Sequence, residues 1–372
     1  MNTIGNNIKI TFFGESHGEY IGVVIDQLKP GILIDFDLID FNLSKRRPKS
    51  NISTPRQEED KYKVISGINE GYTTGAALTF LIPNENTKSK DYKNLLEIPR
   101  PSHADYPAFI KYNGYNEKAG GGIFSGRVTA LWIIVGSICQ QILENNNVYV
   151  CSHINSIYNI CDRSFKNDKI DIETIKDINK EDFPVIDKNK KNEMIDLISS
   201  ISKDLDSLGG TIESSIINLP VGIGEPLFLS VESYLSSLLF SIPGIKGIEF
   251  GDGFNLAKMK GSEANDPYEI NNGKINILSN HNGGILGGIS TGNPIILKLS
   301  VKPTSSIGLK QTSINLKTNE NVELEIIGRH DPQIVSRIVH VVNAVLNFAI
   351  MDLYLFVNKD LKIWCMVCWV KT

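Results

Sequence analysis

The sequence predicts one large domain of the α+β class. Short segments in which apolar and polar residues alternate, a pattern typical of half-buried strands, are separated by long intervals. Between them lies a stretch that is apolar on every face, as in a helix buried on all sides. No Gly/Ser-rich or Pro-rich linker and no fixed-period repeat divides the 372 residues, and the 41% hydrophobic content allows a large core.

The individual elements follow from these patterns. The strands are expected near Ile8 to Phe12, Thr211 to Asn218, Leu297 to Val301 and Val322 to Ile326. The all-apolar helix is expected over Val128 to Leu143, after the turn GGGIFSGR. A one-sided surface helix is expected from Met194 to Leu208, ending at Gly209-Gly210.

Two further stretches have a clear character. The apolar residues from Val341 to Val357 are interrupted by Asn343, Asn347 and Asp352, which predicts a buried core helix in preference to a membrane span. The residues from Asp162 to Asn192 are rich in Lys, Asp and Asn, which predicts a solvated excursion outside the core.

The overall charge and the cysteines exclude several classes of protein. A net charge of -4 argues against binding to nucleic acid or to an acidic membrane, because those surfaces require a basic balance. The five scattered cysteines fit reduced thiols, and the pair Cys365 and Cys368 lacks the second pair or histidine that a zinc site needs. The first residues contain no long apolar segment for export, so the chain is expected in the cytoplasm.

Histidines, glycines and arginines gather in a few short polar loops. These are GESHG at 14–18, RPSHAD at 100–105, GGGIFSGR at 120–127, GGILGG at 283–288, KPTSS at 302–306 and GRHDP at 328–332. His17 and His103 stand in loops framed by glycine or proline, and histidine suits proton transfer because its pKa lies near neutrality. A surface or structural role is the alternative for each histidine taken alone.

The same loops carry groups that bind anions. Ser125 stands at the expected start of a helix beside Arg127, and KPTSS offers one cation, hydroxyls and exposed amides to a phosphate or ribityl chain. Lys45 and Lys49, in the basic run with Arg46, Arg47 and Arg56, are predicted to be solvated. Arginines beside the loops, at positions 100, 127, 329 and 337, indicate a substrate with several anionic groups.

The ordered motifs resemble those of chorismate synthases. They are GESHG, RPSHADY, GGGxFSGRxTA, SIPGIKGIEFGDGF, GSEAND, NGGILGGIS, KPTSSI and GRHDP, within residues 1–357. The resemblance implies one catalytic domain over 1–357 and a diverged tail over 358–372. It also implies a β-α-β sandwich, with buried helices between two four-stranded antiparallel sheets, and a homotetramer.

The implied reaction is the anti 1,4-elimination of phosphate from 5-enolpyruvylshikimate 3-phosphate, which gives chorismate, the last common step of the shikimate pathway to aromatic amino acids. It requires reduced FMN without net oxidation. Because the sequence has no separate GxGxxG nucleotide domain, we expect an outside source of reduced flavin, such as a separate flavin reductase, with NADPH as an indirect reductant.

The resemblance also implies roles for individual residues. His103 resembles the acid that protonates the departing phosphate, His17 the histidine beside the anionic flavin, and Asp331 the carboxylate that helps the flavin N5 accept a proton. The substrate-binding positions are Ser16, Arg46, Arg127 and Arg337, and Arg46 also matches a position for a nicotinamide nucleotide. The flavin-binding positions are Arg46, Phe124, Ser125, Gly287, Lys302, Pro303, Thr304, Ser305, Ser306 and Arg329.

Some positions depart from the family pattern and leave two alternatives open. The departures are Ala119, Ile123, Ser336, His340 and Asn343. Ala119, Ile123 and Asn343 support the alternative of a catalytically weakened homologue that still binds flavin. A metal-dependent hydrolase that uses His17, His103, His330 and Asp331 is the other alternative, although these residues lack the spacings of common zinc motifs.

Overall fold

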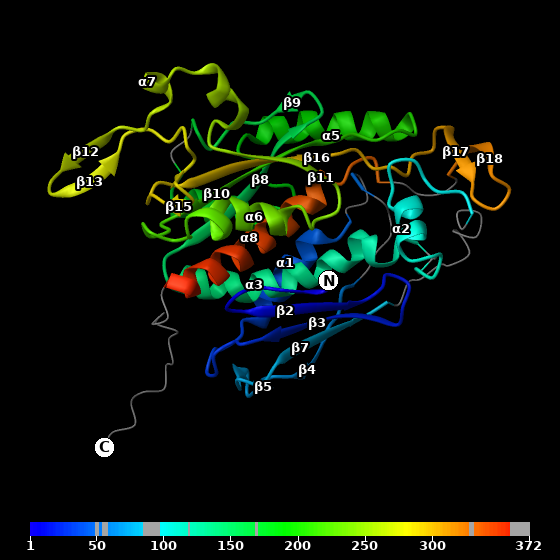
Figure 1. Ribbon diagram of the computed structural model, residues 1–372, viewed down its shortest axis with the longest axis horizontal. Helices are drawn as coiled ribbons and strands as arrows, with labels where there is room; N and C mark the ends of the chain where they lie inside the picture. Colours follow the sequence, from blue (N-terminus) through cyan, green and yellow to red (C-terminus); the bar gives the residue numbers. More distant parts are fainter. Residues whose placement is uncertain are drawn as a thin grey trace.

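The structure is a computed structural model that describes residues 1–48, 52–53, 59–84, 97–117, 120–167, 170–326 and 331–357. Two five-stranded antiparallel sheets form its outer layers (Figure 1). The first has the order β1-β2-β3-β7-β4, with strands Thr3–Ile4, Lys9–Gly14, Tyr20–Asp26, Leu78–Pro83 and Lys63–Ser66. The second has the order β11-β16-β10-β8-β9, with strands Ile245–Phe250, Ile295–Val301, Gly210–Ile217, Tyr149–Ile157 and Ile160–Cys161.

Apolar helices lie between the two sheets (Figure 1). They are α3 (Ala130–Asn145) and α8 (Val335–Val357), with α1 (Phe36–Arg46) packed beside them. α6 (Val231–Leu239) covers another side of α8. One continuous apolar cluster, which extends from Ile8 to Leu353, joins these helices to the inner faces of both sheets.

The remaining elements lie around this frame. The other α-helices are α2 (Asp105–Lys111), α4 (Ile172–Lys180), α5 (Lys188–Lys203) and α7 (Gly261–Ala264). The short 3-10 helices are η2 (Gly122–Phe124), η3 (Gly126–Thr129), η4 (Leu227–Leu229) and η5 (Gly253–Lys258). Small hairpins pair β5 (Ile68–Asn69) with β6 (Tyr72–Thr73), β12 (Tyr268–Asn271) with β13 (Lys274–Ile277), β14 (Ile285–Leu286) with β15 (Ile289–Ser290), and β17 (Gln311–Asn315) with β18 (Glu320–Leu324).

The predicted class and the predicted strands are confirmed, but the strand number of the sheets is wrong. The four expected segments correspond to β2, β10, β16 and β18. Each main sheet has five strands instead of four, because a two-residue strand is added at one edge. This strand is β1, paired with β2, in the first sheet and β9, paired with β8, in the second. Pieces this short carry no alternation that a sequence pattern could reveal.

The expected helices are also present, with one boundary corrected. The all-apolar helix is α3, preceded by η3, and the apolar C-terminal stretch belongs to α8. The one-sided helix α5 ends at Lys203 and does not continue to Gly209, because Leu205 adopts a left-handed φ of 61° that no helix accommodates. Leu208 is buried, but it lies in the loop after the helix.

The stretch from Asp162 to Asn192 is not a purely solvated excursion. It contains α4, and Phe165, Ile175 and Ile178 form a second apolar cluster with strand residues of the β8-containing sheet. Its few apolar residues therefore cover the outer face of that sheet. These apolar residues are widely spaced within a highly charged segment, so the sequence pattern did not predict that they would pack against the sheet.

Two helical segments are long and apolar enough to cross a membrane by composition. They are Gly126–Asn145 and Val335–Leu355, and 78% and 83% of their most apolar windows are buried inside the protein. Both are core helices. Asp352 of α8 is fully buried and accepts hydrogen bonds from the backbone N–H groups of Asn6, Asn7 and Ile8 at 2.6–2.9 Å and from the Tyr234 hydroxyl.

The contact between α3 and α8 requires a glycine at position 136. A Cβ atom added to Gly136 would lie 2.4 Å from both Cα and Cβ of Ala344 and 2.5 Å from its carbonyl oxygen. We predict that Gly136→Ala lowers the free energy of unfolding by about 1–3 kcal/mol, because the two backbones must move apart. Urea denaturation measures this, with Gly261→Ala as the control, since a Cβ there meets nothing within 4 Å. Equal stabilities of the two variants would contradict the prediction.

A buried histidine joins the charged stretch 162–192 to the second sheet. His153 on β8 is 0% exposed, and its Nδ1 and Nε2 atoms lie 3.1 Å from Asp162 and 3.1 Å from Glu213. Burial alone would lower the pKa of His153, but hydrogen bonds and charge attraction from the two carboxylates raise it above its ordinary value of 6.5.

This arrangement makes stability depend on pH. Because the pKa of His153 is raised in the folded state, its contribution is complete below about pH 6.5 and is lost as pH rises through the folded pKa. We predict that the free energy of unfolding, measured with urea between pH 6 and pH 10, declines more steeply in the wild type than in His153→Gln. Parallel pH profiles of the two proteins would contradict this role.

Candidate active site

His17 lies against the glycine triplet of residues 120–122. The backbone N–H of Ser16 donates to the Gly122 carbonyl at 3.3 Å, which joins the loop after β2 to this turn. Gly120 has a φ of +68°, and a Cβ on it would lie 2.5 Å from Nε2 of His17. Only glycine therefore permits this approach of the imidazole to the turn.

His103 is held by a carboxylate at the start of α2. Its Nδ1 atom lies 2.5 Å from Oδ1 of Asp105. Arg100 donates to both oxygens of Asp105, at 2.8 and 2.9 Å, and to the Gly120 carbonyl at 3.1 Å. The loops of His17 and His103 thus meet at Gly120.

The charge of Asp105 determines which ring nitrogen of His103 carries a proton. Burial opposes ionisation of Asp105, but hydrogen bonds from Arg100 and His103 hold its pKa well below the ordinary value. An ionised carboxylate only accepts hydrogen bonds, so Nδ1 of His103 carries the proton and Nε2 is left for a second partner.

The loop 302–306 joins this group from the end of β16. The Lys302 ammonium donates to the Ser102 carbonyl and, at 3.0 Å, to its hydroxyl, while Arg100 approaches the Ser306 hydroxyl at 3.4 Å. Burial, and then the nearby Lys246, lower the pKa of Lys302. The Thr304 hydroxyl donates to the Asp331 carbonyl at 2.7 Å, which connects this loop to the start of α8.

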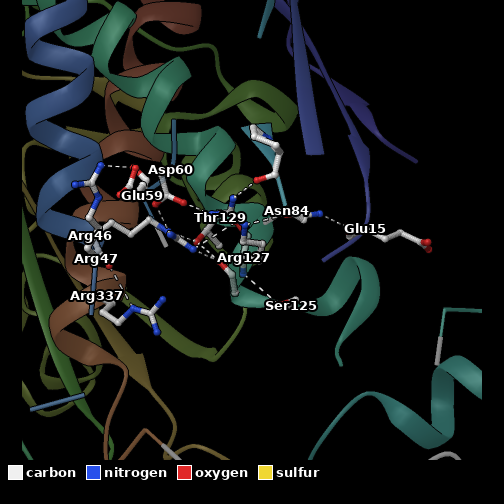
Figure 2. Close-up of polar contacts among 12 residues, drawn as sticks. Glu15, Arg46, Arg47, Glu59, Asp60, Asn84, Ser125, Arg127, Thr129 and Arg337 are labelled. Atoms are coloured by element: carbon white, nitrogen blue, oxygen red, sulfur yellow. Dashed lines mark hydrogen bonds and ion pairs between the residues drawn. The ribbon is translucent and has the colours of Figure 1, made fainter. Parts of the chain in front are cut away.

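Three arginines come together beside these loops (Figure 2). Arg46, at the end of α1, and Arg127, in η3, both form ion pairs with the buried Asp60. Arg337, in the first turn of α8, donates to the Arg46 carbonyl at 3.3 Å and pairs with Asp331 at 3.2 Å. Guanidinium groups from three helical elements are thereby collected in one place.

Asn84 connects this arginine group to the His17 loop. Its side-chain oxygen accepts from Nε of Arg127 at 3.1 Å, and its amide donates to the carbonyls of Glu15 and Gly18 at 2.9 and 2.8 Å (Figure 2). The polar contacts are therefore continuous from the His17 loop to Arg337.

A pocket opens between α2, the glycine turn and the β17–β18 hairpin. Phe124, Asp105, Gly120 and Gly121 contribute to its wall. Ser125 is the N-cap of η3, as expected, and its hydroxyl accepts the Arg127 N–H at 3.2 Å. The ring of Phe124 is partly exposed, so an aromatic face is available at the pocket.

The structure brings together most of the predicted site residues. They are Ser16, His17, Arg46, His103, Phe124, Ser125, Arg127, Lys302, Pro303, Thr304, Ser305, Ser306, Asp331 and Arg337. Gly287 is not among them: it lies in the turn between β14 and β15, near the start of β16, whereas Lys302 follows the end of that strand. Arg329, His330 and Ala119 lie outside the described residues.

The sequence pattern was wrong for one residue and missed three others. Lys45 is buried and not solvated: its ammonium donates to the Asn179 carbonyl at 2.6 Å, and burial lowers its pKa to about 8. Asp60, Asn84 and Asp105 were not assigned, although Asp105 stands inside a motif. Asp60 ends an acidic run that follows the basic one, and only folding reveals its partners.

The replaced residues of α8 have partners in this chain. The backbone N–H of Ser336 donates a hydrogen bond to Oε1 of Gln333 at 2.9 Å, and the Ser336 hydroxyl accepts one from Nε2 of Gln333 at 2.7 Å. His340 contacts the Asp182 carbonyl at 3.0 Å, and the Asn343 side chain accepts from Ser152 at 3.3 Å. The wall that carries Arg337 is therefore packed and hydrogen-bonded. Ile123 is partly exposed beside Phe124.

The metal-site alternative gains no support from the geometry. Among the described residues, which omit His330, no three His, Cys, Asp or Glu side chains converge as metal ligands. The site instead contains several guanidinium groups, several hydroxyls and two histidines. This donor set fits an enzyme that binds a multiply anionic small molecule and moves protons.

Comparison with known proteins identifies the family. The family model for chorismate synthase matches residues 8–355. A chorismate synthase of Dehalococcoides mccartyi is 41% identical over 95% of this chain and 96% of its own length, and one of Methanocaldococcus jannaschii is 42% identical over 95% and 96%. A crystal structure of chorismate synthase has the same fold, with a TM-score of 0.73 and 23% identity over 95% of this chain and 93% of the other.

Arginines, hydroxyls and histidines gathered on an α+β fold with antiparallel sheets fit one general class, an enzyme that acts on a phosphorylated small molecule. The chain belongs to the chorismate synthase family. It is a phosphate-lyase of the shikimate pathway that converts 5-enolpyruvylshikimate 3-phosphate to chorismate.

Proposed function

We propose that His103 is the acid of this elimination and that Asp105 holds it in place. The observation that carries this proposal is the short contact between Nδ1 of His103 and an ionised Asp105. With Nδ1 engaged, Nε2 is the atom that protonates the departing phosphate. Arg100 supports the carboxylate in turn, at 2.8 and 2.9 Å.

The residues fit a reduced flavin mononucleotide, which this family generally uses. The buried hydroxyl of Ser16 has no hydrogen-bond partner among the described residues, as expected where a ligand completes the site. Lys302, Thr304 and Ser306 supply a cation and hydroxyls for the phosphate and ribityl groups, and Phe124 supplies an aromatic face. When bound, reduced FMN would lend electron density to the substrate and take it back without net oxidation.

The other site residues have complementary roles. Arg127 and Arg337 hold the anionic groups of the substrate, because the planar guanidinium matches carboxylate and phosphate. His17 would balance the negative charge of a bound reduced flavin, and Asp331 assists removal of the ring proton. The remaining positions proposed for the flavin are Ser125, Pro303, Ser305 and Arg329.

The decisive experiment is an anaerobic assay with 5-enolpyruvylshikimate 3-phosphate and dithionite-reduced FMN, in which chorismate and phosphate are followed. We expect His103→Ala to lower kcat by about 10²–10⁴-fold, the usual contribution of a positioned general acid. Asp105→Asn should lower it less, since the imidazole remains. Lys310→Gln is the control, because Lys310 lies just before β17 and its side chain is exposed to solvent.

Each alternative has its own outcome in this assay. Flavin binding without turnover by the wild type would favour the weakened homologue, and stoichiometric bound metal would favour the hydrolase. Turnover with NADPH and FMN alone, without dithionite or a flavin reductase, would contradict the expected outside source of reduced flavin. Wild-type kcat in His103→Ala would contradict the assigned acid.

We further propose that residues 1–357 form one cytoplasmic catalytic domain with the family's β-α-β layering, and that it assembles as a homotetramer. The continuous core from Ile8 to Leu353 supports the single domain. The projecting β12–β13 hairpin supports self-association, because Ile270 and Ile275 are 78% and 72% exposed (Figure 1). The tail, residues 358–372, lies outside the described residues.

Light scattering tests the assembly. We expect the wild type to have about four times the chain mass, and the double variant Ile270→Glu/Ile275→Glu to have a smaller assembly mass, because buried charges oppose association. Lys274→Gln on the same hairpin is the control. A monomeric wild type would contradict the homotetramer, and an unchanged mass in the double variant would exclude the hairpin from the interface.

A further inference from the structure

Asn84, the residue that follows β7, binds the loop between β2 and β3. This loop comprises residues 15–19. The side-chain amide of Asn84 donates to the carbonyls of Glu15 and Gly18 at 2.9 and 2.8 Å, and its backbone N–H donates to the Glu19 carbonyl at 3.0 Å (Figure 2). A single residue therefore holds the loop at both of its ends.

The orientation of the Asn84 amide follows from its partners. Its Oδ1 atom accepts a hydrogen bond from Nε of Arg127 at 3.1 Å, and a guanidinium group only donates. The opposite orientation would place an NH2 group against Arg127 and an oxygen against two carbonyl oxygens. The Nδ2 atom therefore faces the loop. Among side chains of this size, only a carboxamide supplies two donors and an acceptor in one plane.

The loop depends on contacts from outside its own residues. Gly14, which precedes it, has a φ of 89°, and Gly18 lies within it. The backbone N–H of Gly18 donates to the Glu15 carbonyl at 3.1 Å, which forms a turn inside the loop. A short loop with glycine near both ends has little conformational preference of its own, so the amide of Asn84 restricts it.

Ser16 and His17 stand between the two carbonyls that the Asn84 side chain holds. The hydroxyl of Ser16 is buried and has no hydrogen-bond partner among the described residues. The imidazole of His17 lies against Gly120, where an added Cβ would be 2.5 Å from Nε2. Because both side chains belong to one short loop, any movement of the loop displaces them together.

We propose that Asn84 is a positioning residue, whose amide orders the loop 15–19 and so places Ser16 and His17 for the reduced flavin. This rests on the proposed function, in which these two side chains serve the flavin. Asn84 acts through the loop and makes no contact with the flavin itself. Its contact with Arg127 is secondary in this role, because that guanidinium group has other acceptors.

Hydrogen exchange of the ligand-free chain, followed by mass spectrometry, tests the ordering of the loop. Asn84→Leu has a similar size and no donor, whereas Asn84→Asp keeps the acceptor for Arg127 and loses both donors. We expect each variant to speed exchange in the peptide that contains the Ser16 and Gly18 amides by roughly tenfold, while peptides of α3 keep their wild-type rates. Loop exchange within about threefold of the wild type in either variant would overturn the proposal.

Anaerobic calorimetry with dithionite-reduced FMN measures the consequence for the site. Both variants should raise the Kd for reduced FMN by roughly tenfold, because Ser16 and His17 are then no longer arranged in advance. The neutral variant is needed beside the charged one, since a new carboxylate by itself repels an anionic flavin. Loss of affinity in only one of the two variants, or in neither, would overturn the proposal.

Asn146→Leu is the matched control. Asn146 is also half-buried, and its amide donates to the Ile142 carbonyl at 2.8 Å, but it lies at the end of α3 that is farther from the site. The substitution should lower the melting temperature and leave the Kd for reduced FMN within about threefold of the wild type. If Asn84→Leu also lowers only the melting temperature, Asn84 is merely structural and the proposal is overturned.

Further outcomes are decisive as well. If neither variant of Asn84 folds, Asn84→Ser, whose hydroxyl supplies one donor, should raise the Kd by roughly fivefold, and an unchanged Kd would overturn the proposal. If the wild type binds reduced FMN and forms no chorismate, the proposed acid chemistry fails, while the exchange rates and Kd values still decide the role of Asn84. A wild type that does not bind reduced FMN would overturn both the proposed flavin site and this proposal.

Discussion

The close packing of α3 on α8 is the constraint on which the rest of the structure depends. Gly136 and Ala344 approach so closely that no side chain fits between the helices. Both helices begin at the same side of the molecule and run in the same direction (Figure 1). Their first residues therefore meet, and these carry the residues on which the site is built, Arg127 just before α3 and Arg337 in the first turn of α8.

The sheets complete the site by placing loops at that same side. β2 leads into the His17 loop and β16 leads into the loop 302–306, and both strands pack against the buried helices. Loops tolerate many amino-acid sequences, whereas the strands and helices that carry them are tightly packed. A rigid core with short loops at one side can hold several charged groups within hydrogen-bond reach of one another.

The sequence was sufficient to predict the class of the fold, the main core helix and most of the residues that the structure brings together at the candidate site, because motif residues lie in short polar loops that differ from their surroundings. It could not reveal residues whose importance arises only from folding. Asp60 and Asn84 stand in unremarkable segments, and their partners, Arg46 and Arg127, are up to 67 positions away in the numbering. The pattern predicts a solvated Lys45, although this side chain is buried, because a run of charged residues does not indicate which of them points into the core.

The balance of charge at the site follows from the same packing. Among the described residues, the arginines at 46, 127 and 337 face the carboxylates of Asp60 and Asp331, so these five side chains together carry one excess positive charge within an acidic protein. Burial makes that charge costly until an anion arrives, because desolvation weakens screening by water. In the proposed function, the phosphate and carboxylate groups of the substrate neutralise this positive charge, and the shared carboxylate of Asp60 holds Arg46 and Arg127 in place before the substrate binds.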